Sequence, residues 1–197
     1  MKKTLIITLS LLISSYTFCQ TPSSFDREEV VEVKNTKAKL YANAQTWIAK
    51  TFGDYKAVIQ FEDKEQGRLI IKGLSDLNVK YYPTFKYTIT IDVKENKYRY
   101  SINEISIGFG GTSNFASSYS PFERTFLALN KVKSNLDSTI AVPTSSMSKK
   151  QLKKHEEEIR SLKENYSNVS FTILKVREIL DSISNSLKTA MKSNDDF

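Results

Sequence analysis

The longest regular pattern of apolar and polar positions lies in the last quarter of the chain, from Ser148 to Lys192. Two series of positions, each spaced by seven residues, carry its side chains: Leu152, Ile159, Tyr166, Ile173, Leu180 and Leu187, and then His155, Leu162, Val169, Val176, Ile183 and Ala190. Only His155 interrupts this apolar seam. A seam kept in one phase over that distance predicts a long amphipathic helix over residues 148–192, either unbroken or kinked near Asn165–Ser170, where weak helix formers gather.

The two halves of this helix are expected to pack differently. The apolar stripe is stronger in Val169–Met191, and we expect that half to pack on a sheet. At 1.5 Å per residue the whole helix is about 65 Å long, which exceeds the roughly 25 Å width of a five-stranded sheet. Leu152–Tyr166 is therefore expected to project, or to pack on a helix predicted over residues 121–142, and we favour the second arrangement.

The first half of the chain predicts a strand and then a helix. Charged and β-branched residues alternate in Glu29–Lys34, which is typical of a strand. Asn35 or Thr36 can cap the helix that follows, and Gly53 can end it in a left-handed conformation. The expected buried stripe of this helix, with Tyr41 at its flank, is Leu40, Ala44, Trp47, Ile48 and Phe52.

Two hairpins follow, and their charges suggest the registers. In the first, Phe61 is expected opposite Leu69, Ile59 opposite Ile71 and Glu62 opposite Arg68. In the second, the apolar pairs are Val93–Tyr98, Ile91–Tyr100 and Ile89–Ile102, and the polar pairs are Asp92–Arg99 and Thr90–Ser101. This alternation predicts a sheet with one buried and one solvent-facing side. The solvent-facing side would carry no exposed aromatic ring, only Lys86, Thr88, Thr90, Asp92, Arg99 and Ser101.

The periodic pattern stops at residues 108–120, which are rich in glycine and serine and predict a flexible loop. Ser120–Glu123 then resembles a capping box with proline in the first helical position, which opens the helix of residues 121–142. Its expected stripe is Phe122, Phe126, Leu129, Leu136 and Ile140. A second capping box, Ser148–Gln151, opens the long C-terminal helix.

The order strand, helix, four strands, helix defines an α+β fold, with an antiparallel sheet covered on one face by helices. The stretches Leu40–Ile48 and Val58–Gly73 resemble the first helix and the first hairpin of a family of exported bacterial proteins. That family is described as a domain of unknown function with a TBP-like fold. The resemblance covers residues 28–107 and implies a TBP-like β-α-β(4)-α domain, here with an extra helix and a long C-terminal helix. It brings no catalytic or binding residue with it.

Residues 1–19 are typical of a secretory signal peptide: Lys2 and Lys3 precede the apolar run Leu5–Ile13. The run is too short for a transmembrane anchor. Residues 20–27 follow as a leader without periodicity. We favour cleavage after Cys19, which would leave Gln20 as the first residue. The alternative is a lipoprotein, lipid-anchored in the envelope through Cys19. Either route predicts an exported protein, periplasmic or secreted.

The residue types available for catalysis and metal binding predict a protein that is not an enzyme and that needs no cofactor or metal. His155 is the only histidine and Cys19 the only cysteine, so no set of histidine and cysteine ligands can form. We interpret His155 as a member of the seam, and Glu156–Glu158 with nearby lysines as ion pairs such as Lys154–Glu158. The net charge of +7 is spread along the chain. Without exposed aromatic wedges on the open side of the sheet, nucleic acid is not an expected partner.

Two hypotheses of function remain, in different classes. The first is an interaction module that binds an unknown envelope protein or other envelope partner, because the seam is longer than one sheet can cover. The second is a helix-grip-like module that holds an apolar small molecule or lipid between the sheet and the C-terminal helix. The residues that would line such a cavity are Tyr82, Tyr87, Tyr98, Tyr100 and Leu180. The same rings could simply fill the core, and a cavity of roughly 300–1,000 Å³ would distinguish the two hypotheses. Oligomeric state does not follow from the sequence.

Overall fold

The structure is a computed structural model that describes residues 25–79, 82–109 and 118–193. Within these ranges the elements follow the predicted order, with two additions. They are β1 (Arg27–Glu32), α1 (Lys37–Phe52), α2 (Tyr55–Val58), β2 (Ile59–Asp63), β3 (Arg68–Val79), β4 (Tyr82–Lys94), β5 (Lys97–Phe109), β6 (Ser118–Pro121), α3 (Phe122–Ile140) and α4 (Lys149–Met191). The predicted signal peptide, Cys19 and most of the leader lie outside the described residues.

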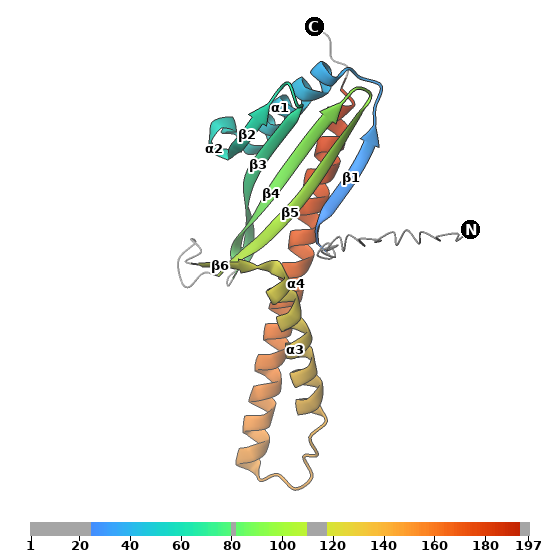
Figure 1. Cartoon of the computed structure of the whole chain (residues 1–197). Coiled ribbons are helices and arrows are strands. Elements are labelled where there is room, and N and C mark those ends of the chain that lie inside the picture. Colours follow the sequence, from blue (N-terminus) through green and yellow to red (C-terminus); the bar gives the residue numbers. More distant parts are fainter. Residues whose placement is uncertain (1–24, 80–81, 110–117, 194–197) are drawn as a thin grey trace, which may run out of the picture.

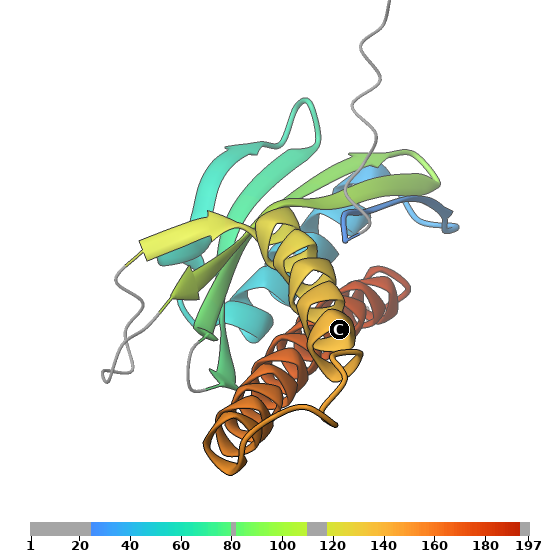
Figure 2. The same ribbon diagram turned by 90° about the horizontal axis from the view of Figure 1, so that it is seen from below.

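The strands form one antiparallel sheet in the order β1-β5-β4-β3-β2, and β6 pairs with β5 beyond the end of β1. α1 and α4 cover one face of the sheet and leave the other face open (Figures 1 and 2). The α+β fold and its helical cover on one face are therefore as predicted. The sixth strand is not, because residues 118–120 were expected to belong to a flexible loop.

α1 and α4 begin and end where the sequence indicates. The Thr36 side chain caps α1 by accepting a hydrogen bond from the backbone N–H of Lys39, and Gly53 follows the helix with a φ of 71°. α4 is one helix of 43 residues. It opens with the predicted capping box, in which Ser148 and Gln151 each bond the other's backbone. The apolar seam therefore belongs to a single helix, of which one half lies on the sheet and the other half extends beyond it (Figure 1).

α3 begins differently from the prediction. Its N-cap is Pro121, which makes no side-chain capping bond, so the expected capping box of Ser120–Glu123 does not form. Ser120 instead pairs with Ile107 as part of β6, and this pairing fixes its backbone in an extended form. At the other end of α3, Ile140 is 51% exposed, although it was predicted to belong to the buried stripe.

The β4–β5 register agrees with the prediction at every pair, from Val93–Tyr98 to Ile89–Ile102. The β2–β3 register does not. Ile59 pairs with Ile71 as expected, but an irregularity before Phe61 places Phe61 opposite Ile70 and Glu62 opposite Leu69. This one-residue slip turns Phe61 to the open face, where it is 43% exposed, so the expectation of an open face without exposed aromatic rings is wrong.

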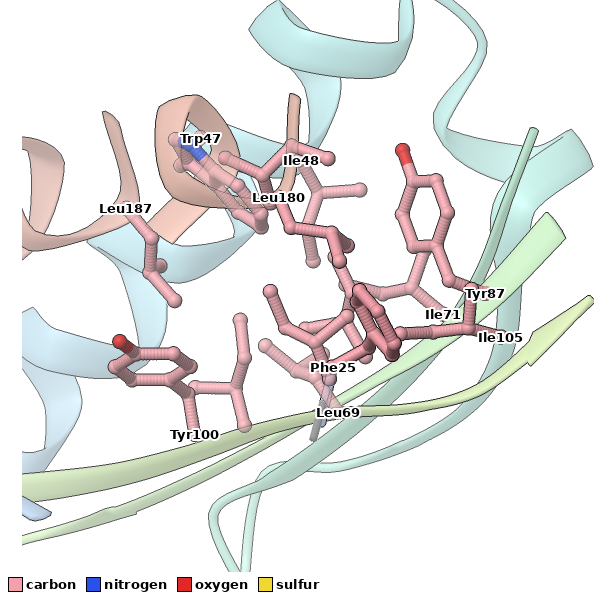
Figure 3. Close-up of a cluster of buried hydrophobic side chains, with 14 of the residues drawn as sticks. Phe25, Trp47, Ile48, Leu69, Ile71, Tyr87, Tyr100, Ile105, Leu180 and Leu187 are labelled. Carbon is pink, nitrogen blue, oxygen red and sulfur yellow. The ribbon is translucent and has the colours of Figure 1, made fainter. Parts of the chain in front are cut away.

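The core lies between the buried face of the sheet and the helices α1 and α4 (Figure 3). Phe25, from the end of the predicted leader, is 1% exposed and contacts Phe122 edge-to-face at 4.5 Å between ring centroids. The domain therefore starts earlier than residue 28, and the first turn of α3 belongs to its core. Trp47 is buried as predicted, and its ring N–H donates a hydrogen bond to the Ser186 hydroxyl at 3.0 Å.

Candidate functional site

The five residues predicted to line an apolar cavity are divided between the core and separate surface hollows. Tyr98 and Tyr100 stack on each other with ring centroids 6.4 Å apart, and both are buried. Leu180 and Tyr87 are buried as well (Figure 3). Tyr82 is half-buried and packs edge-to-face with Phe109. These rings mostly fill the core. The sequence had left open whether they fill the core or line a ligand cavity.

Tyr87 is the member of the five that reaches a hollow next to α4. Its ring lies over Gly73 of the paired strand, where an added Cβ would be 2.3 Å from the ring. Its hydroxyl lies 3.0 Å from the Ser75 hydroxyl, and burial raises the pKa of Tyr87 although that bond opposes the change. Glycine at position 73 therefore lets the ring lie flat on β3, a role that the sequence alone did not reveal.

The hollow beside Tyr87 has a volume of about 440 Å³. It lies where β2 stops pairing with β3, so that α1, α2, β3 and α4 meet around it. Its apolar lining comes mainly from Phe52, Val58, Ile179, Ile183 and Tyr87. The volume falls within the range of small-molecule sites. The place and the lining are those that a helix-grip site would need, although only one predicted residue takes part.

Polar contacts hold α4 against the first strand. Lys188 of α4 forms an ion pair with Glu29, which also accepts a hydrogen bond from the Tyr100 hydroxyl at 3.0 Å. The bond from Lys188 lowers the pKa of Glu29, and the Glu29 carboxylate in turn raises the pKa of Lys188. Arg27 forms a second ion pair with Asp181 at 3.0 Å. These pairs fix the distal half of α4 on the domain.

The other half of α4 packs against α3, and together they form a two-helix arm, defined here as residues 126–168. The arm extends away from the sheet (Figure 1). Burial along α4 divides at Val169: that residue and eight later ones are buried, whereas every described position of α4 before it is exposed or half-buried. The predicted division of the helix is therefore confirmed. α4 runs along the strands rather than across them, so strand length, about 43 Å for 13 residues, sets how much helix the sheet can cover.

The tip of the arm, defined here as residues 138–155, exposes apolar and basic side chains together. Ile140, Val142 and Leu152 are among the exposed large apolar residues. Lys149, Lys150, Lys153 and Lys154 are exposed as well, and none of the ion pairs among the described residues includes them. The predicted Lys154–Glu158 pair is not formed. His155 is half-buried in the seam, as interpreted from the sequence.

The open face of the sheet carries a charged ladder near the β4–β5 turn. Asp92 and Arg99 pair across the strands as predicted, with Asp92 Oδ2 2.7 Å from an Arg99 nitrogen. The structure adds Arg68 of β3, whose Nε donates to Asp92 Oδ1 at 2.6 Å. Burial would raise the pKa of Asp92, but the bonds from Arg68 and Arg99 outweigh it and lower the pKa. A hollow of about 390 Å³ lies over this ladder.

Two further properties concern only the part of the chain that the structure describes. No cluster of three or more histidine, cysteine, aspartate or glutamate side chains there is placed to hold a metal ion. In the same ranges, none of the helices combines the length and the apolar character that crossing a membrane requires.

Residues 28–107 match the model of a family described as a domain of unknown function (DUF4468) with a TBP-like fold, which is the resemblance inferred from the sequence. A crystal structure of a TBP-like protein from Parabacteroides distasonis is 14% identical, with a TM-score of 0.47, and the match covers 83% of this chain and 92% of that one. A DUF4468 family protein from Bacteroides ovatus is 11% identical, with a TM-score of 0.48, over 87% of this chain and 88% of that one. No curated protein matches the chain significantly.

Proposed function

We propose that the chain, whose residues 28–107 match the DUF4468 family model, is an exported, non-enzymatic binding module of the cell envelope. In this proposal the sheet domain is the folded base and the two-helix arm contacts an envelope partner. The observation that carries the proposal is the arm itself, because some twenty residues of α4 and most of α3 lie outside the core.

The surface of the arm supports a role in contact. A helix pair that served only to complete the fold would be expected to end in a polar turn. Here Ile140, Val142 and Leu152 are exposed at the tip, next to four lysines without ion pairs. Exposed apolar side chains beside charged groups are typical of binding surfaces, and here the lysines are followed along α4 by the exposed Glu156–Glu158. The partner would therefore present an apolar recess, with acidic groups placed to meet the lysines.

Export is proposed from residues 1–19, whose basic end and short apolar run are typical of a signal peptide. We propose a mature chain that starts at Gln20, located in the periplasm or secreted. Mass spectrometry of the mature protein tests this point. A diacylated Cys19 at the N-terminus would replace ordinary cleavage by a lipid anchor.

The arm is tested with two charge variants of the exported protein, each compared with the unmodified chain in crosslinking to envelope proteins. Lys149→Glu with Lys153→Glu reverses the charge at the tip. Lys56→Glu with Lys72→Glu makes the same change on the sheet domain. We expect the crosslinks to be lost from the double variant at the tip and kept in the double variant on the sheet domain. If both double variants keep the crosslinks, the arm is not the contact surface.

A second candidate function is the binding of an apolar small molecule or lipid, supported by the hollow of about 440 Å³ beside Tyr87. Ile179→Trp would fill that hollow from α4 without changing a fully buried position, because Ile179 is half-buried. Mass spectrometry of lipids that copurify with the protein tests it. A lipid retained by the unmodified chain and lost from Ile179→Trp would favour this function over the first one.

A further inference from the structure

The hollow on the open face of the sheet collects basic side chains from three strands. Arg68 of β3, Lys94 of β4, and Lys97 and Arg99 of β5 line it, together with one carboxylate, Asp92. It has a volume of about 390 Å³, and its lining also includes the buried Val93 and Tyr98. Its lining shares no residue with the arm or with the hollow beside Tyr87, so it is separate from the two surfaces of the proposed function.

The two arginines are held in place by the aspartate. Each Asp92 carboxylate oxygen accepts a hydrogen bond from one guanidinium, at 2.6 Å from Arg68 and 2.7 Å from Arg99. The Asp92 side chain is only 17% exposed. Among the described residues, the Arg68 side chain forms no hydrogen bond besides the one from its Nε, and the Arg99 side chain bonds Asp92 and lies 3.7 Å from Glu28. Each arginine therefore keeps unused N–H donors beside the hollow. Guanidinium groups oriented in this way can bind an oxyanion through paired hydrogen bonds.

Two of the basic residues that line the hollow place like charges next to each other. Lys94 and Lys97 lie directly opposite each other in the β4–β5 register, and both are exposed. Like charges in that position destabilise a strand pair. Neither lysine forms an ion pair among the described residues. A bound anion would offset this repulsion, and the two lysines would add charge to the donors of the arginines.

Four carboxylates lie around the hollow but outside its lining. Glu28 lies 3.7 Å from Arg99, and Glu32 is opposite Lys97 at the edge strand β1. Glu95 accepts a hydrogen bond from the backbone N–H of Lys37 at the start of α1. Asp63 accepts one from the backbone N–H of Gln66. The lining itself holds four basic groups and one acidic group, so it favours an anion.

We propose that this hollow binds a phosphate monoester, a small oxyanion with two negative charges. Arg68 and Arg99 would bind the phosphoryl oxygens through their free N–H groups, and Lys94 and Lys97 would neutralise the second charge. The volume is adequate for a small ligand or a lipid headgroup. The phosphate could belong to a soluble compound or to phosphatidic acid in a membrane, and the chemistry of recognition is the same.

The test measures binding and stability in the same set of variants. Glycerol 3-phosphate is titrated into the ¹⁵N-labelled protein, and amide shifts are expected to saturate around residues 66–68 and 94–99. Lys97→Gln is expected to weaken binding about fivefold. Glycerol 3-phosphate is expected to raise the melting temperature of the unmodified protein, and to raise that of Lys97→Gln by less, because ligand binding stabilises the folded state in proportion to its affinity. Arg68→Lys keeps the charge, and it is expected to weaken binding by losing the oriented donors.

Lys72→Gln is the matched control, since it removes one exposed lysine from another part of β3 and should leave binding unchanged. Equal weakening by Lys72→Gln, equal stabilisation of Lys97→Gln and the unmodified chain by glycerol 3-phosphate, or binding neither to free glycerol 3-phosphate nor to vesicles with phosphatidic acid would overturn the proposal. Flotation with vesicles of phosphatidylcholine plus phosphatidic acid then identifies the source. Binding to vesicles but not to free glycerol 3-phosphate assigns a lipid headgroup, whereas binding to the free compound alone assigns a soluble ligand. Equal binding to the singly charged headgroup of phosphatidylglycerol would contradict the requirement for two charges.

Discussion

The same truncation at two places in α4 should have very different effects on stability. Leu180 is fully buried between the helix and the sheet, whereas Leu152 is 37% exposed at the tip of the arm. Leu180→Ala removes a fully buried side chain and leaves a cavity, so we expect it to lower the free energy of unfolding by about 3 kcal/mol. Leu152→Ala removes a side chain that is already partly in water, and we expect a loss of roughly 0.5–1 kcal/mol.

Urea unfolding of both variants, followed by circular dichroism, measures the difference. Two conditions make the comparison fair: the residue change and the helix are the same, so helix propensity contributes equally to both. If the two variants lose the same free energy, then the arm is as much a part of the core as the distal half of α4. Burial on the two sides of Val169 would then not determine how much each half of α4 contributes to the free energy of unfolding.

Three further changes test the sheet. Gly73→Ala should cost about 1–3 kcal/mol, because its Cβ would displace the Tyr87 ring, and a thermal melt that matches the unmodified protein would contradict this contact. Ile91→Asp should prevent folding, since it buries an unpaired carboxylate, and a native circular dichroism spectrum would refute the register. The pKa of Asp92 is lowered in the folded protein, so its ionised carboxylate stabilises the fold at pH values above the unfolded-state pKa near 3.8. This stability is lost as the pH falls through the folded-state pKa. Asp92→Asn should therefore flatten the loss of stability in acid, and an unchanged acid transition would show that Asp92 contributes nothing to it.

If only their cross-strand pair is considered, exchanging the charges of Asp92 and Arg99 should leave the stability of the protein unchanged. The structure adds two neighbours that change this expectation. An arginine at position 92 would face Arg68, and an aspartate at position 99 would face Glu28. The exchange therefore creates two like-charge contacts and should lower the melting temperature.

Local patterns predicted those parts of the fold in which one physical requirement dominates. The spacing of Leu180 and its neighbours specified the buried face of α4, and alternation specified the β4–β5 register. The slip at Phe61 could not be predicted, because a strand irregularity depends on what the neighbouring α2 and β3 require. Phe25 was missed because a single apolar residue in a leader has no period, and its partner Phe122 is far away in sequence.

The candidate sites were harder to predict than the fold. Tyr98 and Tyr100 could be placed on the buried face, but whether rings fill a core or line a cavity depends on the exact packing. The anion hollow depends on Arg68, which joins Asp92 only through the β3–β4 pairing. The predicted β4–β5 register placed Asp92 opposite Arg99, and the same register places Lys94 opposite Lys97, so it holds the sequence signal of this site.

Shortening the arm tests the central claim most directly. Phe122 and Thr125 are buried in the core, so the cut must spare the first turns of α3. Residues 130–161 are replaced by a short Gly-Ser linker, which joins α3 to α4 where the two helices lie side by side. The account predicts a folded protein whose free energy of unfolding lies within about 1–2 kcal/mol of the full chain and which no longer forms the tip-dependent crosslinks. A shortened chain that fails to fold, or that retains those crosslinks, would contradict the arm's role as a contact surface on an independent base.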